Sequence, residues 1–158
     1  DGLGHGPDAA EAAREAIRIF RKHTKEGPAA ILKVAHDALR STRGAAGAIA
    51  DIDCDSGMVT FSGIGNIAGA VLAADRRNMV SQNGTLGHHM RTVSEFTYAW
   101  VPDALVILNS DGLQSQWSLN AYPGIAVRDP SLVAAVLYRD FNRGRDDATV
   151  VVAKTAAA

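Results

Sequence analysis

Hydrophobic and polar residues recur with two different periods along the chain, and the change of period separates helices from strands. Near the N-terminus, apolar residues recur every three to four positions with charged residues between them, which predicts an amphipathic helix over residues 8–23. Pro7 suits the first turn of this helix, because proline lacks an N–H that would have no partner there. After Gly27-Pro28, the same period predicts a second helix over residues 28–42.

The middle of the chain changes to short apolar runs bounded by turn-forming residues, which is typical of β-strands. Asp55-Ser56-Gly57 predicts a hairpin turn, and residues 75–78 predict another. Asp129-Pro130 then begins a predicted third helix over residues 130–142. The predicted strands cover residues 45–53, 58–64, 69–74, 79–82, 92–100, 104–108 and 149–153.

The order of these elements indicates the fold class. Strands grouped between helices favour an α+β layered domain over an alternating parallel sheet. The length of 158 residues suits one domain. We assign that domain to residues 1–154 and predict a frayed tail over residues 155–158.

Composition narrows the function classes. Sixteen basic and seventeen acidic side chains give a formal net charge of −1, which argues against a nucleic-acid partner. No apolar run approaches the roughly 20 residues that span a bilayer, and no leader is visible, so we expect a cytoplasmic domain. Cys54 is the one cysteine, which excludes an internal disulfide and fits a reducing compartment. We expect it to be a small buried residue.

Three aspartates stand out by their positions beside glycines and predicted strand ends. Asp1 begins a glycine-rich segment, Asp111 follows the strand at 104–108, and Asp146 precedes the strand at 149–153. Carboxylate and backbone carbonyl oxygens are the ligands that Mg²⁺ and Mn²⁺ prefer. Aspartate beside glycine is also an ordinary turn former, so from spacing alone both interpretations stay open.

Together these segments resemble a known family. The motifs Asp1-Gly2-Leu3-Gly4-His5-Gly6-Pro7, Asn109-Ser110-Asp111-Gly112 and Gly144-Arg145-Asp146-Asp147, in that order, are similar to those of the PPM (type 2C) metal-dependent protein phosphatases. The branch they resemble is the bacterial SpoIIE-like group, and the opening is similar to RsbX-like stressosome phosphatases. Residues 61–66 resemble the same branch, so the resemblance runs from residue 1 to about residue 154.

The resemblance implies a fold and a site. The fold would be a four-layer αββα sandwich of antiparallel sheets with a binuclear Mg²⁺ or Mn²⁺ centre at one edge. Asp1 would bridge the two ions, Gly2 would offer its backbone carbonyl, and Asp111 and Asp146 would supply carboxylates. Asp147 stands where many relatives carry asparagine, so we expect it to be structural.

The resemblance also implies an activity. It is hydrolysis of phosphoserine or phosphothreonine on a bacterial signalling protein, with a STAS-domain regulator of a stress-response or sigma-factor circuit as the expected substrate. Family domains normally begin with a strand pair upstream of the first motif, and those strands are missing here. We therefore expect a fragment of a longer protein, with impaired metal binding and turnover.

Other functions stay open at this stage. The same fold without turnover would be a module that binds a signalling partner. A nucleotide binder is disfavoured, because the chain has no strand–Gly-loop–helix unit with a Lys-Ser/Thr pair. His5 would either protonate the leaving group or brace its loop. Trp117 is most simply a core or rim residue, although it and Tyr122 are also candidate partner contacts. The oligomeric state is open.

Overall fold

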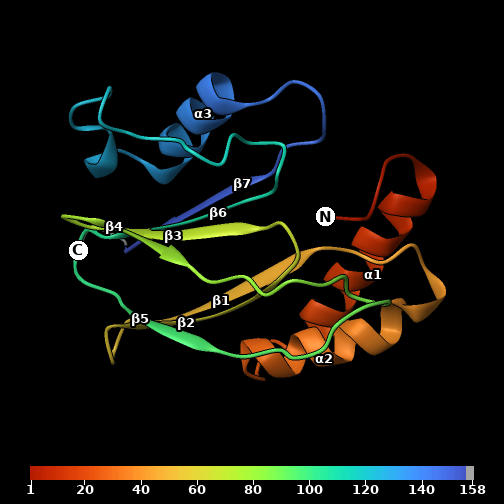
Figure 1. The fold of residues 1–158 in the computed structure, drawn as a ribbon. Coiled ribbons are helices and arrows are strands. Elements are labelled where there is room, and N and C mark those ends of the chain that lie inside the picture. Colours follow the sequence, from red (N-terminus) through yellow and green to blue (C-terminus); the bar gives the residue numbers. More distant parts are fainter. Residues whose placement is uncertain (156–158) are drawn as a thin grey trace.

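The computed structural model describes residues 1–155 and arranges them in four layers (Figure 1). Two antiparallel sheets face each other, with α1 and α2 packed outside one sheet and α3 outside the other. This is the predicted αββα sandwich. Most of the predicted tail, residues 156–158, lies outside the described residues.

The helices follow the predicted positions closely. α1 covers Pro7–Lys22, α2 covers Pro28–Ala38 with a 3-10 turn over Leu39–Ser41, and α3 covers Pro130–Phe141. Each α-helix has proline in its first turn, and in α3 the Asp129 carboxylate also accepts from the Ser131 N–H at 2.8 Å. A further 3-10 turn covers Ile125–Val127. No helix in residues 1–155 is long and apolar enough to cross a bilayer.

The strands form one sheet of three and one of four. The first sheet has the order β1-β2-β5, and the second has the order β4-β3-β6-β7. β5 and β6 follow each other in sequence but belong to different sheets, so residues 100–104 pass from one layer to the other. The strand bounds are Gly47–Asp53 for β1, Met58–Ile64 for β2, Ala68–Leu72 for β3, Arg76–Met79 for β4, Phe96–Ala99 for β5, Leu105–Asn109 for β6 and Val150–Lys154 for β7.

Two strand predictions are wrong in position. The turn expected over residues 75–78 lies at residues 73–75, and its polar residues form β4 instead. An edge strand tolerates such residues because its outer side faces solvent. The strand expected over residues 92–100 begins only at Phe96. Before it, the Glu95 carboxylate accepts the Ala29 N–H at 2.9 Å and so caps α2 from a distant segment.

β6 separates two parts of the core by the two-residue period of a strand. Leu105 and Ile107 pack under α3, whereas Val106 faces the interior between the sheets. All three side chains are buried. β6 is thus packed on both faces, and its end holds the Asp111 loop in place.

The prediction that Cys54 is buried is wrong. Cys54 lies exposed in the β1–β2 turn, where the chain reverses at the surface.

Candidate metal centre

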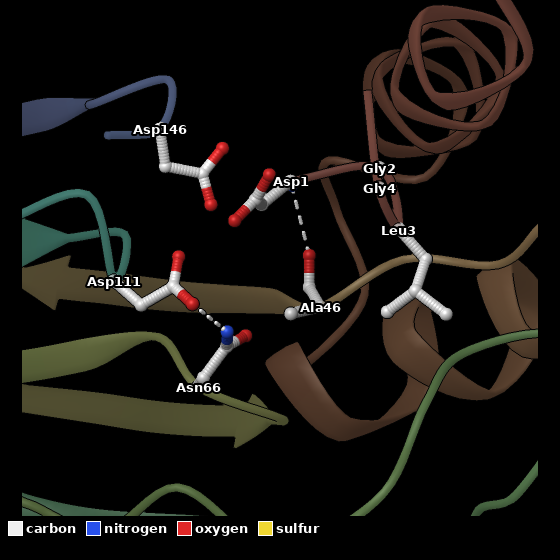
Figure 2. Close-up of a pocket in the computed structure, with 8 residues that line it drawn as sticks. All are labelled: Asp1, Gly2, Leu3, Gly4, Ala46, Asn66, Asp111 and Asp146. Atoms are coloured by element: carbon white, nitrogen blue, oxygen red, sulfur yellow. Dashed lines mark hydrogen bonds between the residues drawn. The ribbon is translucent and has the colours of Figure 1, made fainter. Parts of the chain in front are cut away.

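The four predicted site residues line one pocket of about 170 Å³ (Figure 2). They come from three separate places: the first two residues of the chain, the loop after β6 and the loop before β7. The structure therefore brings Asp1, Gly2, Asp111 and Asp146 together, as the sequence predicted. The remaining lining residues are Leu3, Gly4, Ala46 and Asn66.

The first three residues are held by a short antiparallel pairing. The Ala46 N–H donates to the Asp1 carbonyl at 2.8 Å, and the Leu3 N–H donates to the Gly44 carbonyl at 2.9 Å. The pairing sets Gly2 opposite Ala45. In this antiparallel pattern the hydrogen bonds are made by the residues on either side of Gly2, so the Gly2 carbonyl faces away from the partner segment. It is left available to a ligand.

Gly2 also approaches α1 more closely than any other residue type allows. A β-carbon at this position would lie 1.9 Å from the carbonyl oxygen of Ala9. The side of Gly2 that would carry a side chain is thus filled by helix backbone. The glycine is needed for this close approach, which fixes Asp1 and Gly2 relative to α1.

The backbone nitrogen of Asp1 donates to the Ala46 carbonyl at 2.9 Å. This contact adds to the pairing that holds the first residues of the chain.

The Asp111 and Asp146 loops lie against each other because β6 and β7 are neighbouring strands. Two hydrogen bonds join them: the Ser110 N–H donates to the Thr149 carbonyl at 3.1 Å, and the Thr149 N–H donates to the Ser110 hydroxyl oxygen at 3.0 Å. A β-carbon on Gly112 would lie 2.3 Å from the Asp147 carbonyl oxygen. Glycine at this position therefore lets the two loops meet.

A buried group of polar contacts supports the Asp111 loop from behind. The Trp117 indole N–H donates to the Asn109 amide oxygen at 3.2 Å, and the Asn109 amide N–H donates to the Ser110 carbonyl at 2.9 Å. The Arg76 guanidinium lies 3.8 Å from the centre of the Trp117 ring, and its own burial lowers its pKa. Trp117 is only 4% exposed and belongs to the core under α3, so the packing interpretation is confirmed and the alternative of a partner contact is wrong.

The pocket is rich in acceptors and poor in cations. No lysine, arginine or histidine from residues 1–155 lines it. The Asn66 amide N–H donates to Asp111 Oδ2, and Asp146 Oδ1 accepts the Asp147 N–H at 2.9 Å. Three carboxylates and a free backbone carbonyl form a hard oxygen donor set, which fits Mg²⁺ or Mn²⁺.

The three carboxylates stand apart from one another in this geometry. Within the described part of the chain, no three His, Cys, Asp or Glu side chains are close enough to hold one ion. Like charges repel when no cation stands between them, so separation is the expected arrangement of such a donor set. The aspartates would have to draw together on binding a metal.

Sequence reasoning missed Asn66. It follows Gly65, whose φ of 90° turns the chain sharply at the end of β2. The pair Gly65-Asn66 directly after a buried strand was the available signal, because such turns present a polar side chain at a sheet edge.

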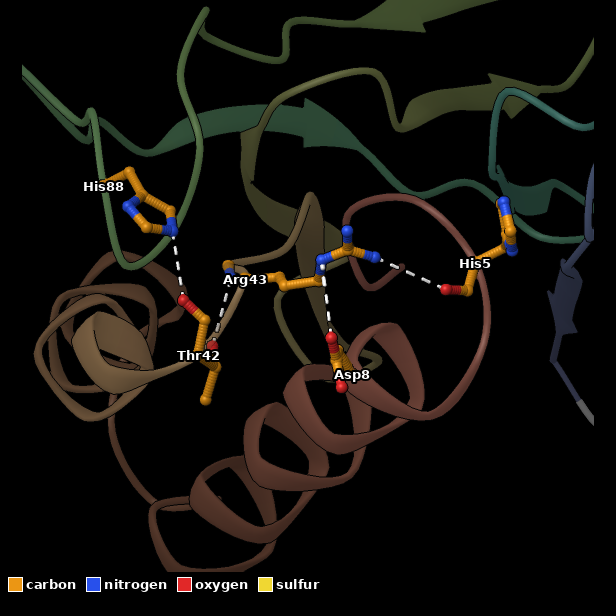
Figure 3. Close-up of polar contacts among 6 residues, drawn as sticks. His5, Asp8, Thr42, Arg43 and His88 are labelled. Atoms are coloured by element: carbon orange, nitrogen blue, oxygen red, sulfur yellow. Dashed lines mark hydrogen bonds and ion pairs between the residues drawn. The ribbon is translucent and has the colours of Figure 1, made fainter.

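His5 does not line the pocket. Its side chain is exposed, and its carbonyl oxygen accepts a long contact of 3.5 Å from Arg43 (Figure 3). Arg43 also lies 3.8 Å from the Asp8 carboxylate, so it braces the glycine-rich loop against the start of α1. These contacts favour the bracing role for the His5 backbone, and a catalytic role for its ring stays a prediction.

Comparison with known proteins identifies the family of the chain. The family described as stage II sporulation protein E (SpoIIE) matches residues 1–156. No curated protein sequence matches the chain. Solved structures do match. One chain, which is 29% identical, comes from a study of the bacterial stressosome as a modular system adapted to control secondary-messenger signalling. That likeness has a TM-score of 0.84 and covers 96% of this chain and 80% of the other.

Two further structures share the fold at lower identity. RsbX in complex with magnesium is 19% identical, with a TM-score of 0.78 over 96% of this chain and 76% of that one. The PP2C phosphatase domain of SpoIIE from Bacillus subtilis, with a fragment of its regulatory domain, is 20% identical. Its TM-score is 0.72 over 96% of this chain and 52% of that one. The chain therefore belongs to the SpoIIE family of PPM-type protein serine/threonine phosphatases.

Proposed function

We propose that residues 1–154 form a metal-dependent phosphatase domain that hydrolyses phosphoserine or phosphothreonine on a bacterial signalling protein. The observation that carries the proposal is the convergence of Asp1, Asp111 and Asp146 on one pocket that no cationic side chain from residues 1–155 lines. Three carboxylates that line one small pocket repel one another, and a bound cation removes that repulsion. Crystals of RsbX contain magnesium, which supports the same class of ion here.

The metal site would be formed by four groups of this chain. The carboxylates of Asp1, Asp111 and Asp146 and the backbone carbonyl of Gly2 would hold two Mg²⁺ or Mn²⁺ ions. A pair of such ions lowers the pKa of bound water and neutralises phosphoryl oxygens. The chain's own contribution is to hold the donors on three rigid supports, namely the pairing with residues 44–46 and the ends of β6 and β7.

The pocket offers no thiol, hydroxyl, imidazole or amine nucleophile, and its carboxylates are the proposed metal ligands. Its lining within residues 1–155 contains no cysteine, serine, histidine or lysine, and Cys54 lies in the exposed β1–β2 turn. Hydrolysis by water, without a covalent enzyme intermediate, is the reaction that this lining supports. The water oxygen bonds to phosphorus as the bond to the serine or threonine oxygen breaks, which releases inorganic phosphate and the restored hydroxyl group.

The similarity to RsbX and to the stressosome chain supports a regulator of a bacterial stress response as the substrate. Among such regulators we propose a STAS-domain phosphoprotein in a partner-switching circuit, as the sequence motifs suggest. We also propose the cytoplasm as the site of action. An exposed free thiol at Cys54 is compatible with a reducing compartment.

A turnover assay tests this function. Phosphate release from a phosphoserine STAS protein is measured with Mn²⁺, with Mg²⁺ and with EDTA. The proteins compared are the unsubstituted chain (the parent chain) and its Asp111→Asn and Asp146→Asn variants. We expect turnover to require metal and to fall at least about 100-fold in either variant. Asp147→Asn is the matched control, because this neighbouring side chain does not line the pocket, and it should retain activity. Turnover that ignores EDTA, or that survives both changes, would refute the proposal.

The alternative is a module that binds the same partner without turnover. It predicts that the phosphorylated partner stays bound and phosphorylated through a long incubation with Mn²⁺. Capture of the partner followed by measurement of its phosphorylation separates the two functions in one experiment.

A further inference from the structure

Asn66 makes a contact between the two sheets at the mouth of the pocket. It lies in the crossing from β2, in the three-stranded sheet, to β3, in the four-stranded sheet. Its amide N–H donates to Oδ2 of Asp111, which follows β6 (Figure 2). The contact joins residues that are 45 positions apart in the sequence.

The backbone on both sides of Asn66 is fixed. The Gly65 N–H donates to the Gln82 carbonyl at 2.9 Å, and the Gln82 N–H donates to the Gly63 carbonyl at 2.8 Å. On the other side, the Ser81 hydroxyl donates to the Ile67 carbonyl at 2.5 Å. The Asn66 side chain therefore reaches Asp111 from a well-held position, although it is itself exposed.

The contact determines how Asp111 presents its carboxylate. Oδ2 is engaged by Asn66, and Figure 2 shows the other carboxylate oxygen directed towards Asp1 and Asp146. A neutral amide gives this orientation without adding positive charge. A lysine or arginine in its place would compete with a bound cation for the same carboxylates.

We propose that Asn66 is a positioning residue that orients Asp111 for metal binding and so sets the Mn²⁺ affinity of the pocket. The inference rests on the proposed function of Asp111 as a metal ligand. Hydrogen-bond partners behind metal ligands typically change metal affinity by about 10- to 100-fold when they are removed. Asn66 is exposed, so its truncation leaves no core cavity.

Direct titration of the parent chain with Mn²⁺ by calorimetry tests the role without reference to turnover. We expect Asn66→Ala to weaken Mn²⁺ binding by about 10-fold or more, with little change in the unfolding temperature of the metal-free protein. Asn66→Lys should abolish Mn²⁺ binding, because its ammonium group would pair with the carboxylates. The matched control is Asn120→Ala, an exposed asparagine that does not line the pocket, and it should bind Mn²⁺ as the parent does.

Asp111→Asn distinguishes failure of this inference from failure of the proposed function. If Asp111→Asn weakens Mn²⁺ binding but Asn66→Ala leaves the affinity unchanged, the Asn66 inference is wrong and the proposed metal site stands. If Asp111→Asn binds Mn²⁺ as tightly as the parent chain, both are wrong. A lower unfolding temperature of metal-free Asn66→Ala, with unchanged Mn²⁺ affinity, would show a structural role and overturn the inference.

Discussion

Gly112 and Asp147 approach so closely that a β-carbon on Gly112 would lie 2.3 Å from the Asp147 carbonyl oxygen. The same β-carbon would lie 2.8 Å from the Cα atom of Ala148, so backbone surrounds the position. Backbone atoms cannot move aside as a flexible side chain can. This contact is therefore a condition for bringing the Asp111 and Asp146 loops to one pocket.

Gly112→Ala should separate the two loops. We expect a loss of about 1–3 kcal/mol in the free energy of unfolding, as for other overpacked sites, together with weaker Mn²⁺ binding. Urea unfolding and calorimetry measure the two effects. Gly144→Ala is the matched control in the neighbouring loop: its β-carbon would meet no atom within 4 Å, so only the strain of its φ of 65° remains. Equal effects of both substitutions on Mn²⁺ binding would contradict the account.

Gly2→Ala should disrupt the other side of the pocket. The added β-carbon would overlap the Ala9 carbonyl oxygen, so the first residues must move away from α1. We expect Mn²⁺ affinity to fall at least about 10-fold, because the Asp1 carboxylate and the Gly2 carbonyl move together. Gly6→Ala is a useful comparison, since its β-carbon would lie in open space and only the strain of its φ of 83° remains. Unchanged Mn²⁺ binding by Gly2→Ala would show that this segment does not contribute ligands.

Trp117→Phe tests the support behind Asp111. The change keeps an aromatic ring beneath Arg76 but removes the indole N–H that the buried Asn109 amide oxygen accepts. An unsatisfied buried acceptor costs about 1–3 kcal/mol, so we expect the free energy of unfolding to fall by that amount. Urea unfolding followed by circular dichroism gives the value. A loss as small as that of a surface substitution would mean that the Trp117–Asn109 hydrogen bond is unimportant.

Asp140 gives the protein a pH-dependent element away from the pocket. Hydrogen bonds from Arg139 and then from Tyr122 lower the pKa of the Asp140 carboxyl to about 2, from an ordinary 3.8. A lowered pKa means that this contribution to stability is present above about pH 4 and is lost as the pH falls towards 2. Asp140→Asn should therefore flatten the decline in unfolding temperature over that interval. An unchanged pH profile would contradict the assignment.

The sequence predicted the positions of the helices, and the meeting of the Asp111 and Asp146 loops, for physical reasons. Proline in the first turn and a regular apolar stripe placed α1 and α3 to within one residue, whereas α2 ends at Ala38 and the rest of the predicted helix is a 3-10 turn. The convergence of Asp111 and Asp146 followed from their positions at the ends of apolar strands. β6 and β7 pair along their whole length, so the residues just beyond their ends must be neighbours.

The remaining features depended on contacts that a linear pattern does not contain. β4 is a polar edge strand, so its residues looked like a turn. The sequence predicted that Trp117 packs in the core or at its rim, but not that Arg76 from that same edge strand covers its ring. Gly65-Asn66 signals a polar turn at a strand end, but the contact of Asn66 with Asp111 depends on how the chain crosses between the sheets.

The central claim is that Asp1, Asp111 and Asp146 bind divalent metal together. Anomalous diffraction from crystals of the parent chain soaked in Mn²⁺ tests it most directly. The account predicts two manganese peaks in the pocket, bordered by these three carboxylates and the Gly2 carbonyl, and their absence in Asp111→Asn crystals. A Mn²⁺-saturated crystal with an empty pocket, or with manganese held elsewhere on the chain, would contradict it.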